Sequence, residues 1–153
     1  MTGLSLFSLI ILATAFFTAF YLNANPNYEF TITPPYHYVP GEFLSELNAF
    51  FFVFIFSLLF FGITAPIALG IEGLKWGSLY SIKAITFYDL AFIVPQVIVS
   101  FSAIMLGQGI ISDYEGKAAL KQVLPTALTY FLAAIALFFA IYLLKPLLAQ
   151  FIS

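Results

Sequence analysis

The sequence predicts an all-α bundle of membrane-spanning helices: four spans plus a short broken or re-entrant helix, with five spans as the alternative. Two observations of composition predict this class. The chain of 153 residues is 63% apolar, with a mean hydropathy of +1.06, whereas soluble domains are roughly 45–50% apolar. Only 8% of the residues are charged. In addition, the apolar residues gather in stretches of about 20, the length that a helix needs to cross a bilayer.

Charge and composition also exclude several functions. All five basic residues are lysines and the net charge is −2, so the chain has no basic surface to neutralise phosphates, and we expect no nucleic-acid partner. Without cysteine there is no disulfide, thiolate metal site or cysteine nucleophile. We expect the partners to be the lipid bilayer and other transmembrane proteins, including further copies of this chain.

Four spans are expected within a single transmembrane domain, 1–153. Residues 4–22 form the first, which we interpret as a retained anchor rather than a cleaved signal peptide because its apolar run is long and no lysine precedes it. Residues 43–69 form the second and 86–107 the third. The fourth is 124–144, with Pro125 in its first turn and Pro146 ending it.

Two segments between the spans are polar or broken. The loop 23–42 is rich in proline and tyrosine, and "YEFTIT" within it alternates as an extended piece does. We place this loop outside the bilayer, its tyrosines in the interfacial belt. The segment 70–85 is apolar but glycine-rich and holds Glu72 and Lys75, so we expect a bend or a re-entrant helix, with a fifth span as the alternative.

Lysine placement predicts the orientation, because short cytoplasmic loops collect positive charge. With four spans and the amino terminus inside, three lysines (75, 83 and 145) face the cytoplasm and two (117 and 121) face outward. The lysine-free loop 23–42 also favours this orientation. We therefore expect a multi-pass protein of the cell membrane with a cytoplasmic amino terminus.

Asp89 is the polar residue that most needs an explanation. Its spacing from Thr86 fits a capping box, which would place the carboxylate in the first turn of a helix, within reach of Lys83. Helical spacing gives a second interpretation, in which Asp89 leads one polar face that turns away from lipid, because lipid penalises a carboxylate. The two interpretations are compatible. This polar face consists of Asp89, Ile93, Gln96, Ser100, Ala103 and Gly107.

Small residues form a second pattern at helical spacing, which lets helix backbones approach closely where lipid gives no hydrophobic drive. This ridge consists of Gly62, Pro66, Gly70, Gly73 and Gly77. We interpret it as a packing surface. The alternative is that the glycines let a loop unwind around Glu72 and Lys75, whose spacing of three residues allows an ion pair.

Enzyme and metal chemistry find little support in the sequence. Aspartyl proteolysis needs two acidic residues at membrane depth, and Asp89 is the one acid that we place there. Zinc proteolysis needs a His-Glu-x-x-His motif, which the sequence lacks. His37 is the single histidine, and we interpret it as a packed surface residue rather than a ligand. We therefore expect no enzyme activity, no metal site and no cofactor.

The order of these features resembles the stage II sporulation protein M-like family of bacterial and archaeal membrane proteins. The resemblance rests on "FLSELNAFFFVFIFSLLFFGITAPIALGIEGLKWGSLYSI", with Asn48 and the small residues of the ridge, and on "FYDLAFIVPQVIVSFSAIMLGQGI". Family members often have a His-Gly pair before a glutamate, where this chain has Thr86, Phe87 and Asp89. The resemblance implies a non-enzymatic polytopic protein; relatives in spore formers assemble with membrane proteins and cell-wall hydrolases.

Three functions follow as hypotheses. The leading one is a membrane scaffold or assembly subunit that packs against other transmembrane proteins. The second is a small oligomeric transporter or channel that uses Asp89, Gln96 and Ser100, with Glu72 and Lys75 as its gate. The third is an accessory subunit of a respiratory or transport complex.

Overall fold

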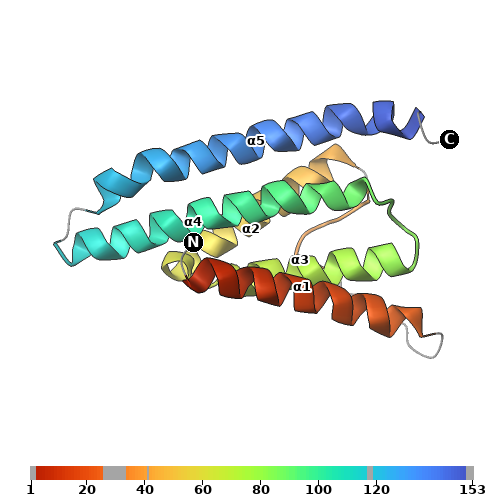
Figure 1. Cartoon of the computed structure of the whole chain (residues 1–153), viewed down its shortest axis with the longest axis horizontal. Helices are drawn as coiled ribbons and strands as arrows, with labels where there is room; N and C mark the ends of the chain where they lie inside the picture. Colours follow the sequence, from red (N-terminus) through yellow and green to blue (C-terminus); the bar gives the residue numbers. More distant parts are fainter. Residues whose placement is uncertain (1–2, 26–33, 41, 117–118, 151–153) are drawn as a thin grey trace.

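The chain folds into an all-α bundle, seen in a computed structural model that describes residues 3–25, 34–40, 42–116 and 119–150 (Figure 1). The five α-helices are α1 (Gly3–Ala24), α2 (Phe43–Leu58), α3 (Ala65–Ser81), α4 (Ile93–Tyr114) and α5 (Leu120–Gln150), and two short 3-10 helices are η1 (Leu59–Gly62) and η2 (Asp89–Phe92). The described residues contain no strand. The predicted fold class is confirmed.

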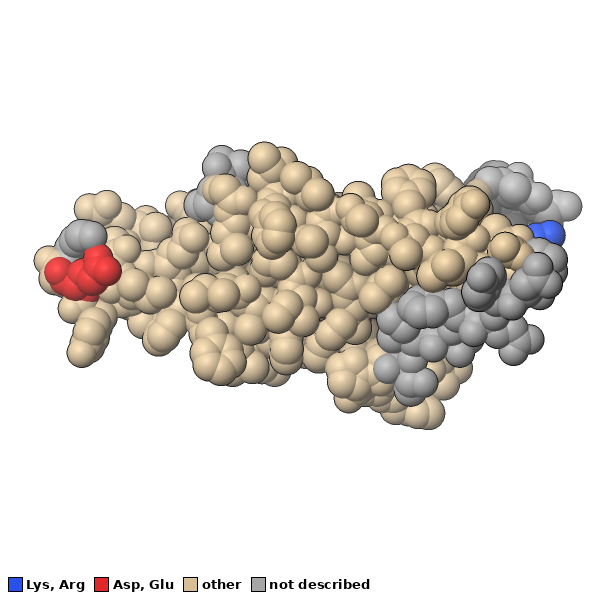
Figure 2. All heavy atoms as spheres, turned by 90° about the horizontal axis from the view of Figure 1, so that it is seen from below, with Lys and Arg blue, Asp and Glu red and all other residues tan. Residues whose placement is uncertain are grey.

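The helices form a row in which each packs mainly on one or two neighbours (Figure 1). Helix α1 packs on α3, α5 packs on α4, and α2 contacts both α3 and α4. Four helical stretches are long and apolar enough to cross a membrane: Gly3–Ala24, Phe43–Gly62, Asp89–Tyr114 and Leu120–Leu147. On the face that Figure 2 shows, charged side chains lie only at the two ends of the molecule. These features indicate a multi-pass membrane protein.

The second predicted span, 43–69, is wrong in its second half, because the helix ends at Leu58. Phe60, Phe61 and Gly62 all have positive φ, at 50°, 59° and 91°, and this left-handed turn reverses the chain. Thr64 stabilises the turn: its hydroxyl donates to the carbonyl oxygen of Leu59 at 2.8 Å and to that of Phe56. Such bonds satisfy carbonyl groups that a helix end leaves without partners.

The glycine-rich segment is helical, so the predicted bend at 70–85 is also wrong over most of its length. Helix α3 starts with Pro66 in its first turn, where a missing N–H costs little, and continues unbroken to Ser81. Gly70, Gly73 and Gly77 lie successively against Ile11, Leu12 and Phe16 of α1, so α1 and α3 run parallel. The chain enters α3 at one end of the bundle and leaves at the other, which favours five passes over a re-entrant helix.

This course changes the lysine distribution used to predict the orientation. Because α3 runs parallel to α1, Lys83 lies at the end of the bundle opposite to the start of α1. Lys145 lies at that same end, because it pairs with Asp89 at the start of η2. Lys75 is buried and belongs to neither end. The predicted count of three lysines on the side of the amino terminus is therefore wrong.

The last two spans are longer than predicted. The third begins at Asp89 rather than at residue 86 and α4 extends to Tyr114, while α5 runs from Leu120 to Gln150. Both Pro125 and Pro146 lie inside α5, so the prediction that Pro146 ends this helix is wrong. Each proline removes one backbone N–H close to an end of a 31-residue helix, where the many remaining bonds keep the helix intact.

Candidate functional site

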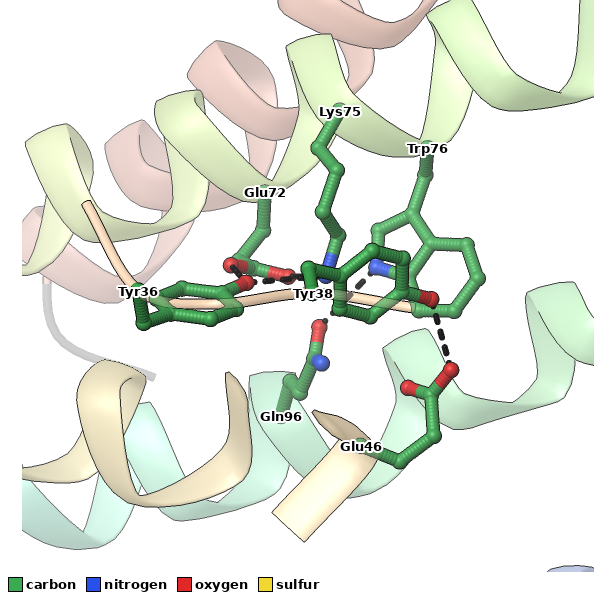
Figure 3. A network of polar contacts seen from close by, with 7 residues as sticks. All are labelled: Tyr36, Tyr38, Glu46, Glu72, Lys75, Trp76 and Gln96. Atoms are coloured by element: carbon green, nitrogen blue, oxygen red, sulfur yellow. Dashed lines mark hydrogen bonds and ion pairs between the residues drawn. The ribbon is translucent and has the colours of Figure 1, made fainter. Parts of the chain in front are cut away.

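The polar centre of the bundle is built around residues 34–40, which fold inward between α2 and α3 (Figure 3). The prolines of this segment favour extended backbone, and its side chains alternate: Tyr36 and Tyr38 are half-buried, whereas His37 and Val39 are exposed. The Tyr36 ring lies 5.2 Å from that of Phe52, in the middle of α2. The prediction that these tyrosines form an interfacial belt is wrong. The "YEFTIT" piece lies outside the described residues.

An ion pair between Glu72 and Lys75 lies at the middle of the site, as their spacing of three residues predicts. The Lys75 Nζ lies 2.5 Å from Glu72 Oε2, and the two side chains are 1% and 0% exposed. The helical segment around them does not unwind, so the alternative of a glycine-opened loop is wrong. A buried pair is stable only when further hydrogen bonds compensate for the lost water.

Tyr36 supplies those further hydrogen bonds. Its hydroxyl donates to Glu72 Oε1 and accepts from Lys75 Nζ at 2.9 Å (Figure 3). The ammonium group also lies 4.1 Å from the ring centroid of Tyr38 and 4.5 Å from that of Trp76. Aromatic faces attract cations through their quadrupole, so the lysine charge is compensated by one carboxylate, one phenol and the surrounding rings.

Glu46, in the first turn of α2, brings a second carboxylate to the site. The Tyr38 hydroxyl donates to Glu46 Oε1 at 2.6 Å, and the side chain of Glu46 is only 1% exposed. Its other oxygen, Oε2, is buried and has no hydrogen-bond partner among the described residues. The site therefore holds two carboxylates and one ammonium group, which together leave an excess of one acid.

The two phenols act as hydrogen-bond donors over the physiological pH range. Burial raises the pKa of Tyr36 and of Tyr38 far above the ordinary value of 10.0, and the adjacent carboxylates Glu72 and Glu46 raise it further. The cause is that a phenolate here would lose its water and face a negative charge. Residues 34–40 therefore close the site with two neutral donors.

The polar face of α4 turns toward protein, as predicted, and Gln96 joins the site. The Gln96 side chain is 1% exposed and its Oε1 accepts from the indole N–H of Trp76 at 3.2 Å. One turn further, the hydroxyl groups of Ser100 and Ser57 are 3.1 Å apart. Ala103 and Gly107 continue the face and are buried, with Gly107 packed against the backbone of Phe61.

Asp89 forms a separate ion pair at the end of the bundle. Its Oδ2 accepts from the backbone N–H and the hydroxyl of Thr86, both at 2.7 Å, as the acid of the predicted capping box would, but the N-cap residue of η2 is Tyr88 rather than Thr86. Thr86 does not accept in return, since its hydroxyl donates. The charged partner of Asp89 is Lys145 of α5, at 2.5 Å, rather than the predicted Lys83.

The small-residue ridge is confirmed as a packing surface, but its contacts lie within the chain. A side chain at Gly73 would meet the backbone of Leu12, and one at Gly77 would meet that of Phe16. Gly62 lies in the reversing turn, where a Cβ would be 2.9 Å from the Cα of Ile104, and Pro66 is buried. Gly70, Gly73 and Gly77 therefore explain why α1 lies so close to α3, whereas Gly62 lets the turn lie close to α4.

Four residues of the site escape the sequence analysis: Tyr36, Tyr38, Glu46 and Trp76. The count of Asp89 as the only acid at membrane depth is wrong, because Glu46 and Glu72 are more deeply buried than Asp89. Two signals in the sequence could have found the site: the period-two alternation of "PYHYVP", and an acid, Glu46, at the start of an otherwise apolar run.

No group of three or more histidine, cysteine or acidic residues within the described part of the chain could hold a metal ion. Comparison of the chain with protein-family models, with curated proteins and with solved structures found no match. The resemblance to the stage II sporulation protein M-like family therefore stays a prediction. The case for a function rests on the geometry of the site.

Proposed function

We propose that this chain is a subunit of a non-enzymatic membrane transporter or channel for protons or small cations, and that the cluster of Tyr36, Tyr38, Glu46, Glu72 and Lys75 is its ion site. Ionisable groups deep inside a membrane bundle are expensive and serve most often in ion or proton movement. The carrying observation is that Glu72 and Lys75, both almost fully buried, are closed off by an inserted segment rather than by another helix.

The cluster takes over the role that the sequence analysis gives to Asp89, Gln96 and Ser100. Of these three residues only Gln96 lies at the cluster, through its bond from Trp76, while Asp89 and Ser100 are paired elsewhere. The groove beside α1 and α4, with a volume of about 440 Å³, is lined by apolar residues and offers an ion no ligand. A continuous path therefore needs movement of residues 34–40 or a second copy of the chain.

Flux into vesicles tests this proposal. We expect purified chain in liposomes that contain a pH-sensitive or Na⁺-sensitive dye to speed ion entry under an imposed membrane potential. The double variant Glu72→Gln/Lys75→Met removes both charges without leaving either unpaired, and we expect it to lower that rate at least tenfold. Asp113→Asn, an exposed acid at the end of α4, is the matched control. Absence of flux for protons, Na⁺ and K⁺ would refute the function.

A scaffold or assembly subunit of the cell membrane is the second candidate, and the outer helices favour it. In the most apolar stretch of α5 only 17% of the residues are buried within the chain, and in α1 only 22%. A groove of about 220 Å³ between α2 and α5 is lined by Phe50, Phe51, Phe138 and three other apolar residues. Mass measurement in mild detergent tests this candidate, and a lone monomer with no co-purifying protein would count against it.

A cytoplasmic start of α1 remains part of the proposal, supported by the lysine-free loop 23–42 that follows α1. Because the chain lacks cysteine, one introduced cysteine gives a unique label. Gly3→Cys is suited to this test, since a side chain there meets no other atom within 4 Å. We expect a membrane-impermeant maleimide to label Gly3→Cys only after the cells are opened, and labelling of intact cells would reverse the orientation.

A further inference from the structure

Glu46 is the group that the packing of the site leaves without compensation. If Glu46, Glu72 and Lys75 were all charged, the cluster would carry one net negative charge on side chains that are at most 1% exposed. An isolated buried carboxylate is so unfavourable that the group takes up a proton instead. Glu72 has Lys75 at 2.5 Å and Tyr36 as a donor, so Glu72 is the carboxylate that keeps its charge.

The surroundings of Glu46 Oε2 fit a neutral carboxylic acid. Oε1 accepts from the Tyr38 hydroxyl at 2.6 Å, a distance that suits a carboxylate oxygen as well as the carbonyl oxygen of an acid. Oε2 is buried and has no donor among the described residues, although a carboxylate oxygen in such a place would need one. A neutral hydroxyl without a partner costs much less free energy than an unpaired charge in the same place.

From this arrangement we propose that Glu46 is a proton-binding site and that the ion of the proposed function is therefore the proton. The inference rests on that function for its role, and it names the ligand. A metal cation fits less well, because hard cations take six or more oxygen ligands and no group of three or more histidine, cysteine or acidic residues in the described part of the chain could hold one. The ammonium group of Lys75 would also repel a metal ion.

Charged groups on every side of Glu46 set the balance between its two forms. Lys75 of α3 favours the carboxylate, while Glu72 of α3 and Asp89 at the start of η2 favour the acid. The hydrogen bond from Tyr38 of the inserted segment also favours the carboxylate. Asp89 in turn pairs with Lys145 of α5, whose side chain is 28% exposed, so this ion pair connects the surroundings of Glu46 to the end of the bundle.

Infrared difference spectroscopy tests the inference without relying on transport. The purified full chain in lipid is taken from neutral to alkaline pH, and the carbonyl stretching band of protonated carboxylic acids is recorded. We expect the wild type to show a band equal to one acid per chain that disappears on alkalinisation, and Glu46→Gln to lack it. Asp113→Asn is the matched control and should keep the band. An unchanged band in Glu46→Gln, or no band in the wild type, would overturn the proposal.

A second variant keeps the test decisive if Glu46→Gln fails to fold. Tyr38→Phe removes the hydrogen bond that the carboxyl group of Glu46 receives at Oε1, so its carbonyl band should move to higher frequency while the band area stays constant. A band that does not move belongs to another acid and contradicts the assignment. Flux without the Glu46 band would refute this inference alone, whereas the band without any flux would refute the proposed function alone.

Discussion

Two lysine–carboxylate pairs described above, Lys75–Glu72 and Lys145–Asp89, have the same length but differ in what surrounds them. Lys75 and Glu72 are 2.5 Å apart at side-chain exposures of 1% and 0%, whereas Lys145 and Asp89 are 2.5 Å apart at 28% and 7%. The first pair has a phenol and aromatic rings around it. The second pair is surrounded by the backbone N–H and hydroxyl of Thr86 and by solvent. Distance alone therefore does not distinguish the two ion pairs; burial and the nature of the neighbours do.

The largest effect is expected from breaking the inner pair on one side only. Lys75→Met leaves Glu72 buried without its cation, and we expect a loss of about 3–5 kcal/mol in the free energy of unfolding. Thermal unfolding in mild detergent measures it. Adding Glu72→Gln to the same chain should restore most of the stability. If the single variant unfolds at the wild-type temperature, the pair does not contribute to the fold.

The second-largest effect is expected from alkaline pH, which should destabilise the region around the inner pair through its two tyrosines. The folded pKa of Tyr36 and of Tyr38 lies above the unfolded value of 10.0, so the stability that these phenols contribute is complete below pH 10 and is lost as the pH rises further. Each tyrosine should lower the free energy of unfolding by about 1.4 kcal/mol per pH unit above this value. Denaturant titration between pH 9 and 12 measures the slope. The double variant Tyr36→Phe/Tyr38→Phe should flatten it, and an equal slope in both chains would contradict the assignment.

Tyr36→Phe alone tests how much the inserted segment compensates the inner pair. The change removes one hydroxyl that both donates to Glu72 and accepts from Lys75. We expect a loss of about 1–3 kcal/mol, because each buried polar group then lacks a partner. The matched control is Tyr114→Phe, since Tyr114 is 95% exposed. Equal unfolding midpoints for the two variants would show that the phenol is dispensable.

The outer pair should give a smaller effect that depends on salt. Asp89→Asn keeps acceptors for Thr86 but loses the charge that faces Lys145, and partly exposed pairs contribute about 1 kcal/mol at most. Added salt screens such pairs, so the difference from wild type should shrink at 1 M NaCl. A loss as large as that of Lys75→Met would remove the distinction between the two regions.

The smallest effect is expected at His37, between the two tyrosines. His37 is exposed while both of its neighbours of the same segment point inward, so His37→Ala should change the free energy of unfolding by less than about 0.5 kcal/mol. The same melting experiment measures it. A large loss at this position would mean that the outward side of residues 34–40 binds a partner.

The sequence predicts what is local and fails where the contact is distant. Apolar length predicts the first span, helical spacing predicts the pairing of Glu72 with Lys75, and the polar face of α4 turns toward protein as expected. The reversal at Phe60 and Phe61 escapes prediction because the apolar run continues through both residues, although Gly62, Thr64 and Pro66 directly after them are typical of a turn followed by a new helix. The bond from Tyr36 to Glu72 spans 36 residues, and no spacing rule reaches that far.

The reversal at Phe60, Phe61 and Gly62 has a consequence for cell biology. It lets α3 run the length of the bundle beside α1, so the start of α1 and the end of α5 lie at opposite ends of the bundle (Figure 1). A membrane crossed by all five helices would hold these two ends in different compartments. If reporter proteins were fused to the two ends, a protease added to whole cells would then digest one reporter and leave the other intact.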